Sequence, residues 1–559
     1  MKGKPGWAAQ TALATLALCV VSVMFSWPYA RLGTDVLTRQ NDVYGVYWLV
    51  DSARDLLPEL HSPLTGGPDG ESFYRIDSYV VLGIGWLLGP ALGAHRIVQF
   101  LVLAGPVIGG LAAERCAVLG LGVRSPWSII AGLAWAFPGL AATAILDGHV
   151  YFLLDPFLPL LALGLLRASG PGGTVGDGLL AGTALSFALY TSGYLGVLGA
   201  GLGLVLGLRA LFVRADRWRL LRPLAGFLVG ALPPCIAFAL VFASGSGGAG
   251  GPLATLSDAV LTTISTAATQ APVADLLEHS VAAPLGFVTV ALLCAAPVVL
   301  RTRRGWRTLT GIAIAALVLS TGLNLRGGLG DELSVVLPGA SLIGSAATFF
   351  HFPVRALWLF HLCGGLVAAQ VADVLAAEAG AARAAPLLVL AGLDGIVLNA
   401  VPQRIESVPA VGPAVYDALA PGRRILDLMP EDPSTGQDFE MWMRNRWCYF
   451  QTLHHRPVMH RCLGAYSEDP SEGVARTLFD GILGLADASP AGRAGMARKL
   501  RESTLATGVE VVVVYLDLFE PSDRDAVLDG LGTLAGPPVA WSQNAGLTVA
   551  AYDLEAGAP

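Results

Sequence analysis

Residues 7–27 read WAAQTALATLALCVVSVMFSW, an apolar run that follows Lys2 and Lys4. A run of this length suffices for an α-helix to cross the hydrocarbon core of a bilayer, which takes about 20 residues. The run is longer than the apolar region of a signal peptide, and Pro28-Tyr29-Ala30 lacks the small residue that a cleavage site needs three positions back. We therefore predict an uncleaved first span, with the N-terminus in the cytoplasm.

Similar apolar stretches recur as far as residue 401. Apolar residues make up 54% of the chain and charged residues only 14%, whereas a soluble domain has about 25% charged residues. The bilayer is therefore the main solvent, and nucleic acid is not an expected partner. We predict further spans at roughly 78–94, 96–113, 127–146, 150–167, 177–192, 194–211, 222–243, 284–300, 308–323, 353–376 and 385–401.

Short loops rich in arginine indicate which side of the membrane is cytoplasmic. With the N-terminus in the cytoplasm, these arginine-rich loops would lie on the outer side of the membrane if 78–94 and 96–113 both crossed it. We therefore predict one net crossing for 31–113, with the piece around Gly83–Gly93 lying along or re-entering the membrane. This gives about eleven crossings, in preference to twelve. The clusters contain Arg115, Arg124, Arg167, Arg209, Arg214, Arg217, Arg219, Arg222, Arg301, Arg303, Arg304 and Arg307.

The residues after 401 have a different composition. Residues 424–428, 509–515 and 547–552 are typical of buried strands, while 473–487 and 490–505 are typical of helices. The sequence thus predicts a polytopic transmembrane helical bundle over 1–401, including an external loop at 31–77, and a periplasmic α/β domain over 402–559.

Cysteines and histidines are grouped in this tail. Cys448 and Cys462 form its only cysteine pair, and in the periplasm they would be able to form a disulfide; the sequence leaves both states open. His454, His455 and His460 lie between them. Their spacing matches no zinc pattern, so polar loop residues are favoured over metal ligands.

The external loop, residues 31–77, contains the candidate catalytic residues. Asp35 follows the first span within two turns, where partial desolvation raises the basicity of a carboxylate, as a general base requires. A solvated loop aspartate is the alternative. Tyr44, Tyr47 and Trp48 have helical spacing and predict an amphipathic helix on the membrane surface, which either walls a groove for a lipid tail or is a plain connector.

Several motifs, in order along the chain, resemble bacterial multi-pass membrane glycosyltransferases of the GT-C type, which use polyprenyl-phosphate sugars. The first span ends in Gly33-Thr-Asp35, and an aromatic helix with Asp-Ser-Ala-Arg-Asp-Leu-Leu follows at 51–57. Later motifs are Leu88-Gly-Pro90, Trp135-Ala-Phe-Pro138, His149, Pro156-Phe-Leu-Pro-Leu160 and Phe350-His-Phe-Pro-Val-Arg355 before a span. The resemblance implies a GT-C-like fold.

The resemblance also implies transfer of a sugar from a polyprenyl-phosphate donor to an acceptor glycan, lipid or protein on the outer face of the bacterial cytoplasmic membrane. A glycosyl phosphate has a good leaving group, so one carboxylate suffices for inversion. Asp35 would be this base, with Asp42 as alternate or orienter. Arg355 would hold the phosphate, and the other donor-binding candidates are His149, Arg75, Tyr44 and Trp48.

Arg355 and His149 also have simpler interpretations. The first is an interfacial anchor at lipid headgroups, and the second is a loop residue that caps a helix. Some GT-C proteins hold a divalent cation with carboxylates, but those that use simple lipid-phosphate sugars generally need none. Because the loop has no tight acidic cluster, we expect no metal or other cofactor.

Two other classes of function remain. A lipid or glycan transporter would carry internal repeats and charges near the middle of its spans. The few charges within spans, Asp155, Asp177, Asp373 and Asp394, fall mostly near span ends, which favours chemistry at the membrane surface. The third possibility is a catalytically inactive GT-C-like protein that acts in lipid or glycan binding or in assembly.

Overall fold

The protein divides into two compact units, which are described separately. In the computed structural model, the helical unit comprises 1–33, 77–80 and 98–405, and the tail unit comprises 34–76, 81–97 and 406–559. The external loop and the start of the next helix therefore cluster with the tail. The structure describes residues 6–27, 35–37, 42–57, 59–66, 68, 70–72, 78–146, 148–213, 217–244, 286–301, 303, 305–320, 324–326, 334–336, 353–397, 407–409, 413–428, 448–460, 462, 470–544 and 547–556.

Long apolar helices make this a multi-pass membrane protein. Among the described residues, six stretches are long and apolar enough to span a bilayer: Trp7–Phe25, Tyr79–Gly120, Val150–Ala168, Gly193–Phe212, Trp218–Leu240 and Leu357–Ala379. The helices of the helical unit are α1 (Trp7–Phe25), α6 (Ile129–Ala136), α7 (Gly139–Leu146), α8 (Phe157–Ala168), α9 (Val175–Thr191), α10 (Gly193–Val213), α11 (Leu221–Ser244), α14 (Phe287–Val299), α15 (Trp306–Ser320), α17 (Leu357–Ala379) and α18 (Ala381–Val397). The predicted polytopic helical fold is confirmed.

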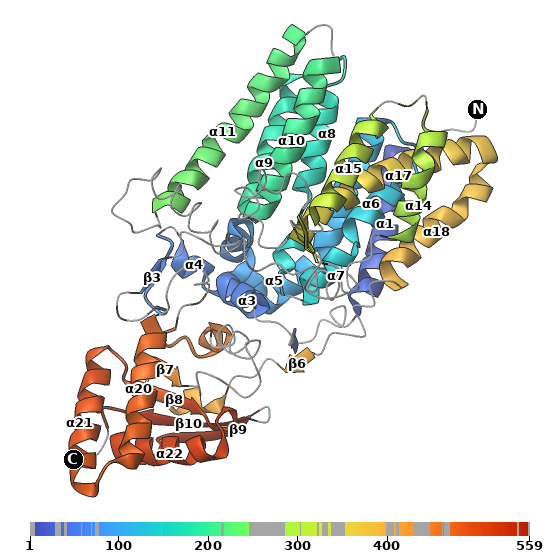
Figure 1. Cartoon of the computed structure of the whole chain (residues 1–559). Helices are drawn as coiled ribbons and strands as arrows, with labels where there is room; N and C mark the ends of the chain where they lie inside the picture. Colours follow the sequence, from blue (N-terminus) through green and yellow to red (C-terminus); the bar gives the residue numbers. More distant parts are fainter. Residues whose placement is uncertain are drawn as a thin grey trace. The chain divides into compact units, whose positions relative to one another are not determined.

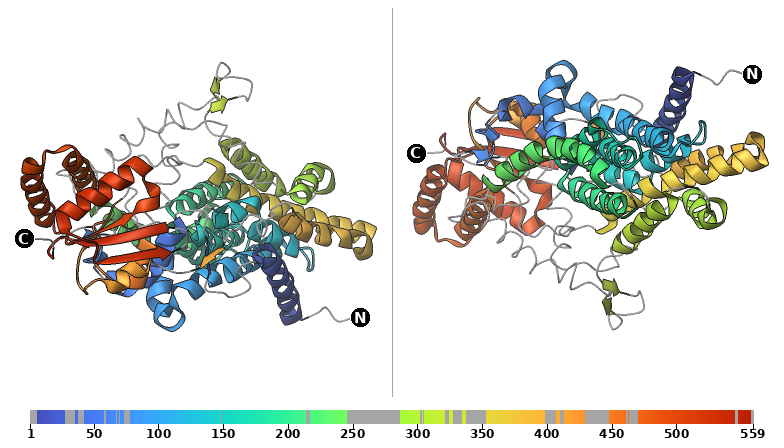
Figure 2. Two further views of the ribbon diagram at one scale, coloured as in Figure 1. Left: turned by 90° about the horizontal axis from the view of Figure 1, so that it is seen from below. Right: turned by 90° about the horizontal axis from the view of Figure 1, so that it is seen from above.

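Within the helical unit the helices form two groups (Figures 1 and 2). In one, α9 packs against α8, α10 and α11. In the other, α6, α14, α15 and α18 surround α17, which is buried along most of its length. A short strand pair, β4 (Asn324–Arg326) with β5 (Ser334–Val336), also lies in this unit.

Helix α5 (Tyr79–Arg115) consists of two helical pieces that meet at a kink, close to the boundary expected between 78–94 and 96–113. It is interrupted at Gly93, where φ is 74° and ψ is 161°, a conformation that glycine adopts at low cost. Residues 81–97 belong to the tail unit, and those from 98 onward belong to the helical unit. A π-helical turn, Cys116–Gly120, follows α5. The single net crossing of 31–113 stays a prediction.

Helices α9 and α11 approach each other closely through glycines. A Cβ atom on Gly178 would lie 1.8 Å from the carbonyl oxygen of Pro223, and one on Gly182 would lie 2.2 Å from that of Phe227. On the opposite helix, a Cβ on Gly226 would lie 2.1 Å from the oxygen of Val175. Small residues at such positions let membrane helices pack backbone to backbone.

We expect Gly178→Ala to lower the unfolding free energy by about 1–3 kcal/mol, because the added methyl overlaps a backbone atom that cannot move alone. Thermal unfolding of the full-length protein in detergent measures this change. Gly201→Ala, in α10, is the matched control, since a Cβ there meets nothing within 4 Å. Equal melting temperatures for the two variants would contradict the close approach.

The tail carries a four-stranded sheet in the order β7 (Ile425–Leu428), β8 (Val511–Tyr515), β10 (Leu547–Asp553) and β9 (Ala540–Asn544) (Figure 1). Strands β7 and β8 are parallel, and the other pairs are antiparallel. Helices α20 (Pro470–Asp487), α21 (Pro490–Ala506) and α22 (Pro521–Ala535) supply the rest of the hydrophobic core. The predicted strands and helices are confirmed, whereas β9 and α22 were not predicted from the sequence.

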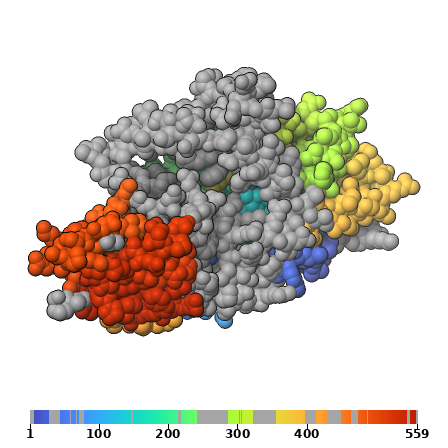
Figure 3. Space-filling view, turned by 60° about the horizontal axis from the view of Figure 1, so that its bottom comes forward, coloured from blue at the N-terminus to red at the C-terminus, as the bar shows by residue number. Residues whose placement is uncertain are grey.

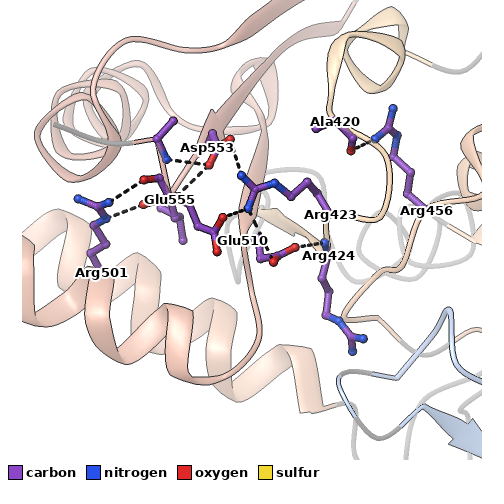
Figure 4. Close-up of polar contacts among 10 residues, drawn as sticks. Ala420, Arg423, Arg424, Arg456, Arg501, Glu510, Asp553 and Glu555 are labelled. Carbon is purple, nitrogen blue, oxygen red and sulfur yellow. Dashed lines mark hydrogen bonds and ion pairs between the residues drawn. The ribbon is translucent and has the colours of Figure 1, made fainter.

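Arginines close one end of this sheet (Figure 4). Arg423, just before β7, lies 3.3 Å from Asp553 and 3.7 Å from Glu510, and it also pairs with Glu555. Arg501 of α21 donates to the backbone oxygens of Leu554 and Glu555. These contacts join the ends of three strands. In Figure 3 the tail residues, in orange and red, form one continuous surface.

A buried polar cluster lies at β7 and β8. Tyr416, in the 3₁₀ turn Ala414–Ala418, donates to Asp427 Oδ1 at 2.6 Å, and its hydroxyl also lies 2.6 Å from that of Tyr515. His460 Nε2 accepts from the Asp427 backbone N–H at 3.1 Å. Burial raises the pKa of Asp427 to about 7, although the two tyrosine hydrogen bonds oppose this shift.

The stability of the tail depends on pH through Asp427 and His454, with opposite signs. Folding raises the pKa of Asp427 from 3.8 to about 7, so its contribution is complete below pH 3.8 and is lost as the pH rises through 7. Burial lowers the pKa of His454 from 6.5 to about 3, so its contribution is present above pH 6.5 and is lost as the pH falls through 3. Between about pH 4 and 6.5 the two effects offset each other.

We therefore expect Asp427→Asn to expose the pH dependence that His454 causes. The amide retains the oxygen that accepts from Tyr416 but does not titrate. The variant's tail should lose about 1.4 kcal/mol of stability per pH unit as the pH falls from about 6.5 to 4, while the native tail changes little. Hydrogen exchange of β7 and β8 in the full-length protein measures this, with the exposed Asp480→Asn as control. A variant that tracks the native protein would disprove the assignment.

Candidate functional site

Arg355 and His149 meet in the helical unit although 206 residues separate them. Arg355 lies in a 3₁₀ turn, Pro353–Ala356, that leads into α17. The fixed φ of proline suits the first position of such a turn. His149 precedes the 3₁₀ turn Val150–Leu153, and Gly148, with φ of 78°, reverses the chain before it. The two side chains are therefore presented by short turns between helices.

The two side chains lie within reach of a hydrogen bond. Arg355 Nη2 lies 3.4 Å from His149 Nε2. Because a guanidinium only donates, the histidine nitrogen is the acceptor in this contact.

The guanidinium of Arg355 contacts two aromatic rings. Its central carbon lies 4.1 Å from the ring centroid of Tyr194 and 4.9 Å from that of Phe152. Cation–π contacts of this kind orient an arginine without neutralising it. An anion would meet this guanidinium at its edge, where two parallel N–H groups match two phosphate oxygens.

Further buried groups support these rings. Phe152 stacks on Trp358 with centroids 6.4 Å apart, and Trp358 packs against Trp135 at 5.2 Å. Trp135 Nε1 donates to the backbone oxygen of Asp155 at 3.0 Å, and the Asp155 carboxylate caps α8 by accepting from the N–H groups of residues 157 and 158. Arg355 therefore lies against a layer of buried aromatic side chains.

The other predicted site residues belong to the tail unit. Asp35 is the first residue of strand β1 (Asp35–Leu37), and Asp42 is the first residue of helix α3 (Asp42–Asp51). The side chains of both, and the whole of Arg75, lie outside the described residues. Their predicted roles stay predictions.

The aromatic helix differs from the expectation of an exposed, interfacial helix. Tyr44, Tyr47 and Trp48 in α3 are 2%, 1% and 0% exposed. Inside the tail unit, Tyr44 packs against Tyr449, and Tyr47 packs against Tyr449 and His95, with ring centroids 4.7–5.6 Å apart. The sequence pattern does not distinguish a protein partner from a headgroup layer, because both favour amphipathic aromatic residues.

Two rings that hold Arg355 were missed in the sequence. Phe152 and Tyr194 lie at the start of apolar stretches, where aromatic residues usually serve as core. Two features of the sequence could have pointed to these rings. Phe152 lies three residues after His149, and Tyr194 directly follows Gly193, the first residue of α10.

The histidines of the tail have protein partners. The His454 ring stacks on Tyr416 with centroids 4.4 Å apart, and its Nδ1 accepts from the Arg456 backbone N–H at 3.0 Å. Within the described part of the chain, no group of three or more His, Cys, Asp or Glu side chains is placed to hold a metal ion. The need for a metal stays untested. Cys448 and Cys462 form a disulfide, which the sequence had left open.

No protein-family model and no curated protein matches this chain. Solved structures do. The Archaeoglobus fulgidus oligosaccharyltransferase, without ligand, is 14% identical with a TM-score of 0.50, over 93% of this chain and 71% of that one. The mycobacterial arabinofuranosyltransferase AftD, in two classes of one variant, is 16% identical with TM-scores of 0.55 and 0.52, over 100% of this chain.

The chain has the fold of the GT-C glycosyltransferases. This confirms the fold that the sequence motifs predicted. The chain corresponds to 42% of the length of AftD. Within this GT-C fold, Arg355 and His149 occupy the turns before α17 and α8.

Proposed function

We propose that this GT-C protein transfers a sugar from a polyprenyl-phosphate-linked donor to an acceptor hydroxyl on the outer face of the cytoplasmic membrane. The fold supports glycosyl transfer, since the similar structures are an oligosaccharyltransferase and an arabinofuranosyltransferase. The observation that carries the proposal is Arg355, whose guanidinium is oriented by two aromatic rings and by His149.

The reaction exchanges one C–O bond of the sugar for another. The acceptor oxygen attacks the anomeric carbon as the bond to the phosphate oxygen breaks, and the configuration inverts. Asp35 takes the proton of the acceptor hydroxyl, and the lipid phosphate leaves with the bonding electrons. Arg355 stabilises the charge that grows on the phosphate, and its N–H groups lose nothing to reorientation because they are already fixed. Asp42 orients the acceptor or Asp35.

The disulfide supports an outer location for the tail. Disulfides persist in oxidising compartments and are rare in the cytosol. Cys448–Cys462 therefore favours a periplasmic tail in a bacterial cytoplasmic membrane. The same orientation results from the arginine-rich loops on the opposite side of the spans.

Full-length protein in lipid nanodiscs tests the proposal. The probes are synthetic polyprenyl phosphates that carry radiolabelled arabinofuranose or hexoses, and water serves as a general acceptor, so that release of free sugar is measured. Binding of unloaded polyprenyl phosphate is measured in parallel. Turnover of one donor class is expected. Lipid binding with no turnover of any donor would instead support the inactive GT-C-like binding or assembly protein.

We further expect turnover to be unchanged after dialysis against EDTA, because Arg355 supplies the charge that a cation would otherwise give to the leaving phosphate. Initial rates before and after dialysis, and after Mg²⁺ or Mn²⁺ is added back, measure this. Loss of activity that a divalent cation restores would contradict the proposal that no metal is needed.

A further inference from the structure

We propose that Gln451 is a positioning residue for Asp35, and that the tail acts on the reaction by fixing the segment that carries the base. This inference rests on Asp35 being the base of the proposed function. Its physical ground is that the tail holds the chain at Asp35 itself, through a strand pair, and again 13 residues later, through a buried hydrogen bond of Trp48.

The first contact is made by the backbone of Asp35 itself. Strand β1 pairs antiparallel with β6 (Ser407–Pro409), so that Asp35 lies opposite Pro409 and Leu37 opposite Ser407. Both strands belong to the tail unit. A ladder of this kind sets the register of the chain, because a slip by one residue would turn every side chain to the other face.

The second contact begins five residues after β1. Helix α3 starts at Asp42, and its Trp48 Nε1 donates to Gln451 Oε1 at 2.9 Å. Both side chains are buried, at 0% and 1% exposure, so water does not replace this bond. Next to Gln451, the Tyr449 ring contacts those of Tyr44 and Tyr47 with centroids 5.4 and 5.6 Å apart.

The residues that hold α3 lie in one closed loop. The Cys448–Cys462 disulfide bounds this loop, which contains Tyr449 and Gln451. Two backbone hydrogen bonds also join this loop to the external segment. The Gly66 N–H donates to the His460 oxygen at 3.0 Å, and the Val458 N–H donates to the Leu64 oxygen at 2.8 Å. The external segment is thus attached to the loop both at α3 and beyond it.

These contacts determine where Asp35 is placed. A general base works within hydrogen-bond reach of the proton that it removes, about 2.6–3.2 Å between heavy atoms. A displacement of about 1 Å can cost on the order of 10²-fold in rate. The Trp48–Gln451 bond fixes α3 against the rest of the tail, and α3 begins only five residues after the end of the strand that carries Asp35.

The test uses two substitutions. Gln451→Met replaces the acceptor with an apolar side chain of similar length. Trp48→Phe removes the donor and keeps an aromatic ring. We expect each variant to lower kcat for sugar release about 10-fold or more with unchanged affinity for unloaded polyprenyl phosphate. The double variant should be no slower than the slower single variant, because both remove the same bond. Gln543→Met, on the exposed edge strand β9, is the matched control with native kcat.

Combination with Asp35→Asn separates positioning from general stability. If Gln451 acts through the base, Gln451→Met should not slow the residual reaction of Asp35→Asn any further. An equal slowing in both backgrounds, or a native kcat in both Gln451→Met and Trp48→Phe, overturns the inference and leaves the proposed function standing. A change confined to the KM of a hydroxyl acceptor assigns the loop to acceptor binding and also overturns it.

Failure of the proposed function gives a different result. If Asp35→Asn turns over donor at the native rate, the base is wrong, and the positioning role of Gln451 falls with it. Thermal midpoints and a thiol count of the intact disulfide are recorded for every variant. If Gln451→Met does not fold, Trp48→Phe alone decides, since it retains most of the buried ring area.

Discussion

Asp35→Asn should slow sugar release from the labelled donor about 10²- to 10⁴-fold, the range that removal of a general base costs. Asparagine retains the size and polarity of the side chain but does not accept the proton from the attacking hydroxyl. Affinity for unloaded polyprenyl phosphate should stay native, because the base acts on the acceptor and not on the lipid phosphate. Single-turnover rates and lipid binding to the full-length protein measure both quantities.

Asp55→Asn is the matched control. Asp55 lies in the same external segment, in the short helix α4 (Ala53–Leu56), and is exposed. It should turn over donor at the native rate. Equal losses in the two variants would mean that negative charge in the segment, rather than one base, supports the reaction. A native rate for Asp35→Asn would show that a group other than Asp35 removes the proton.

Arg355→Lys should lower turnover about 10²- to 10³-fold, as loss of one fixed donor to a developing anion does. Lysine keeps the charge but lacks the planar fork that binds two phosphate oxygens and stacks between Tyr194 and Phe152. Affinity for unloaded polyprenyl phosphate should also fall, because the same groups hold the phosphate before and after transfer. This joint loss distinguishes Arg355 from Asp35.

Arg383→Lys controls for the substitution, since Arg383 lies exposed in α18. It should have native turnover and lipid binding. If Arg355→Lys behaves in the same way, Arg355 is an interfacial anchor, because lysine reaches the headgroups equally well. His149→Gln separates the contribution of the imidazole, and its effect should be smaller because the aromatic rings still orient Arg355.

The membrane class and the α/β tail were predictable, because hydrophobic length and strand patterns are local properties of the sequence. Arg355 and His149 were also predicted, from motifs at the ends of apolar stretches. The packing of α3 was not, since the partner of Trp48 lies 403 residues away. Strand β9 was missed because Trp541-Ser-Gln-Asn has few of the β-branched residues that mark a strand.

The roles of Tyr194 and Phe152 were not predicted either, and the reason is physical. A ring that packs against a cation and a ring that packs against leucine occur in equally apolar sequence. Only the path of the chain, which brings two 3₁₀ turns and the start of α10 together, distinguishes them. Gln451 gave only a weak indication of the Trp48 contact, because a polar residue that directly follows Phe450 needs a hydrogen-bond partner if it is buried.

The long sequence separation between Trp48 and Gln451 affects the synthesis of the protein. At about 5–20 residues per second, a ribosome needs on the order of 20–80 s to add the 403 residues between them. During that interval three aromatic rings of the nascent helix lack their final covering, and any chain interrupted before residue 448 retains them uncovered. Folding of the protein therefore includes a late step, in which α3 packs against the loop that contains Gln451.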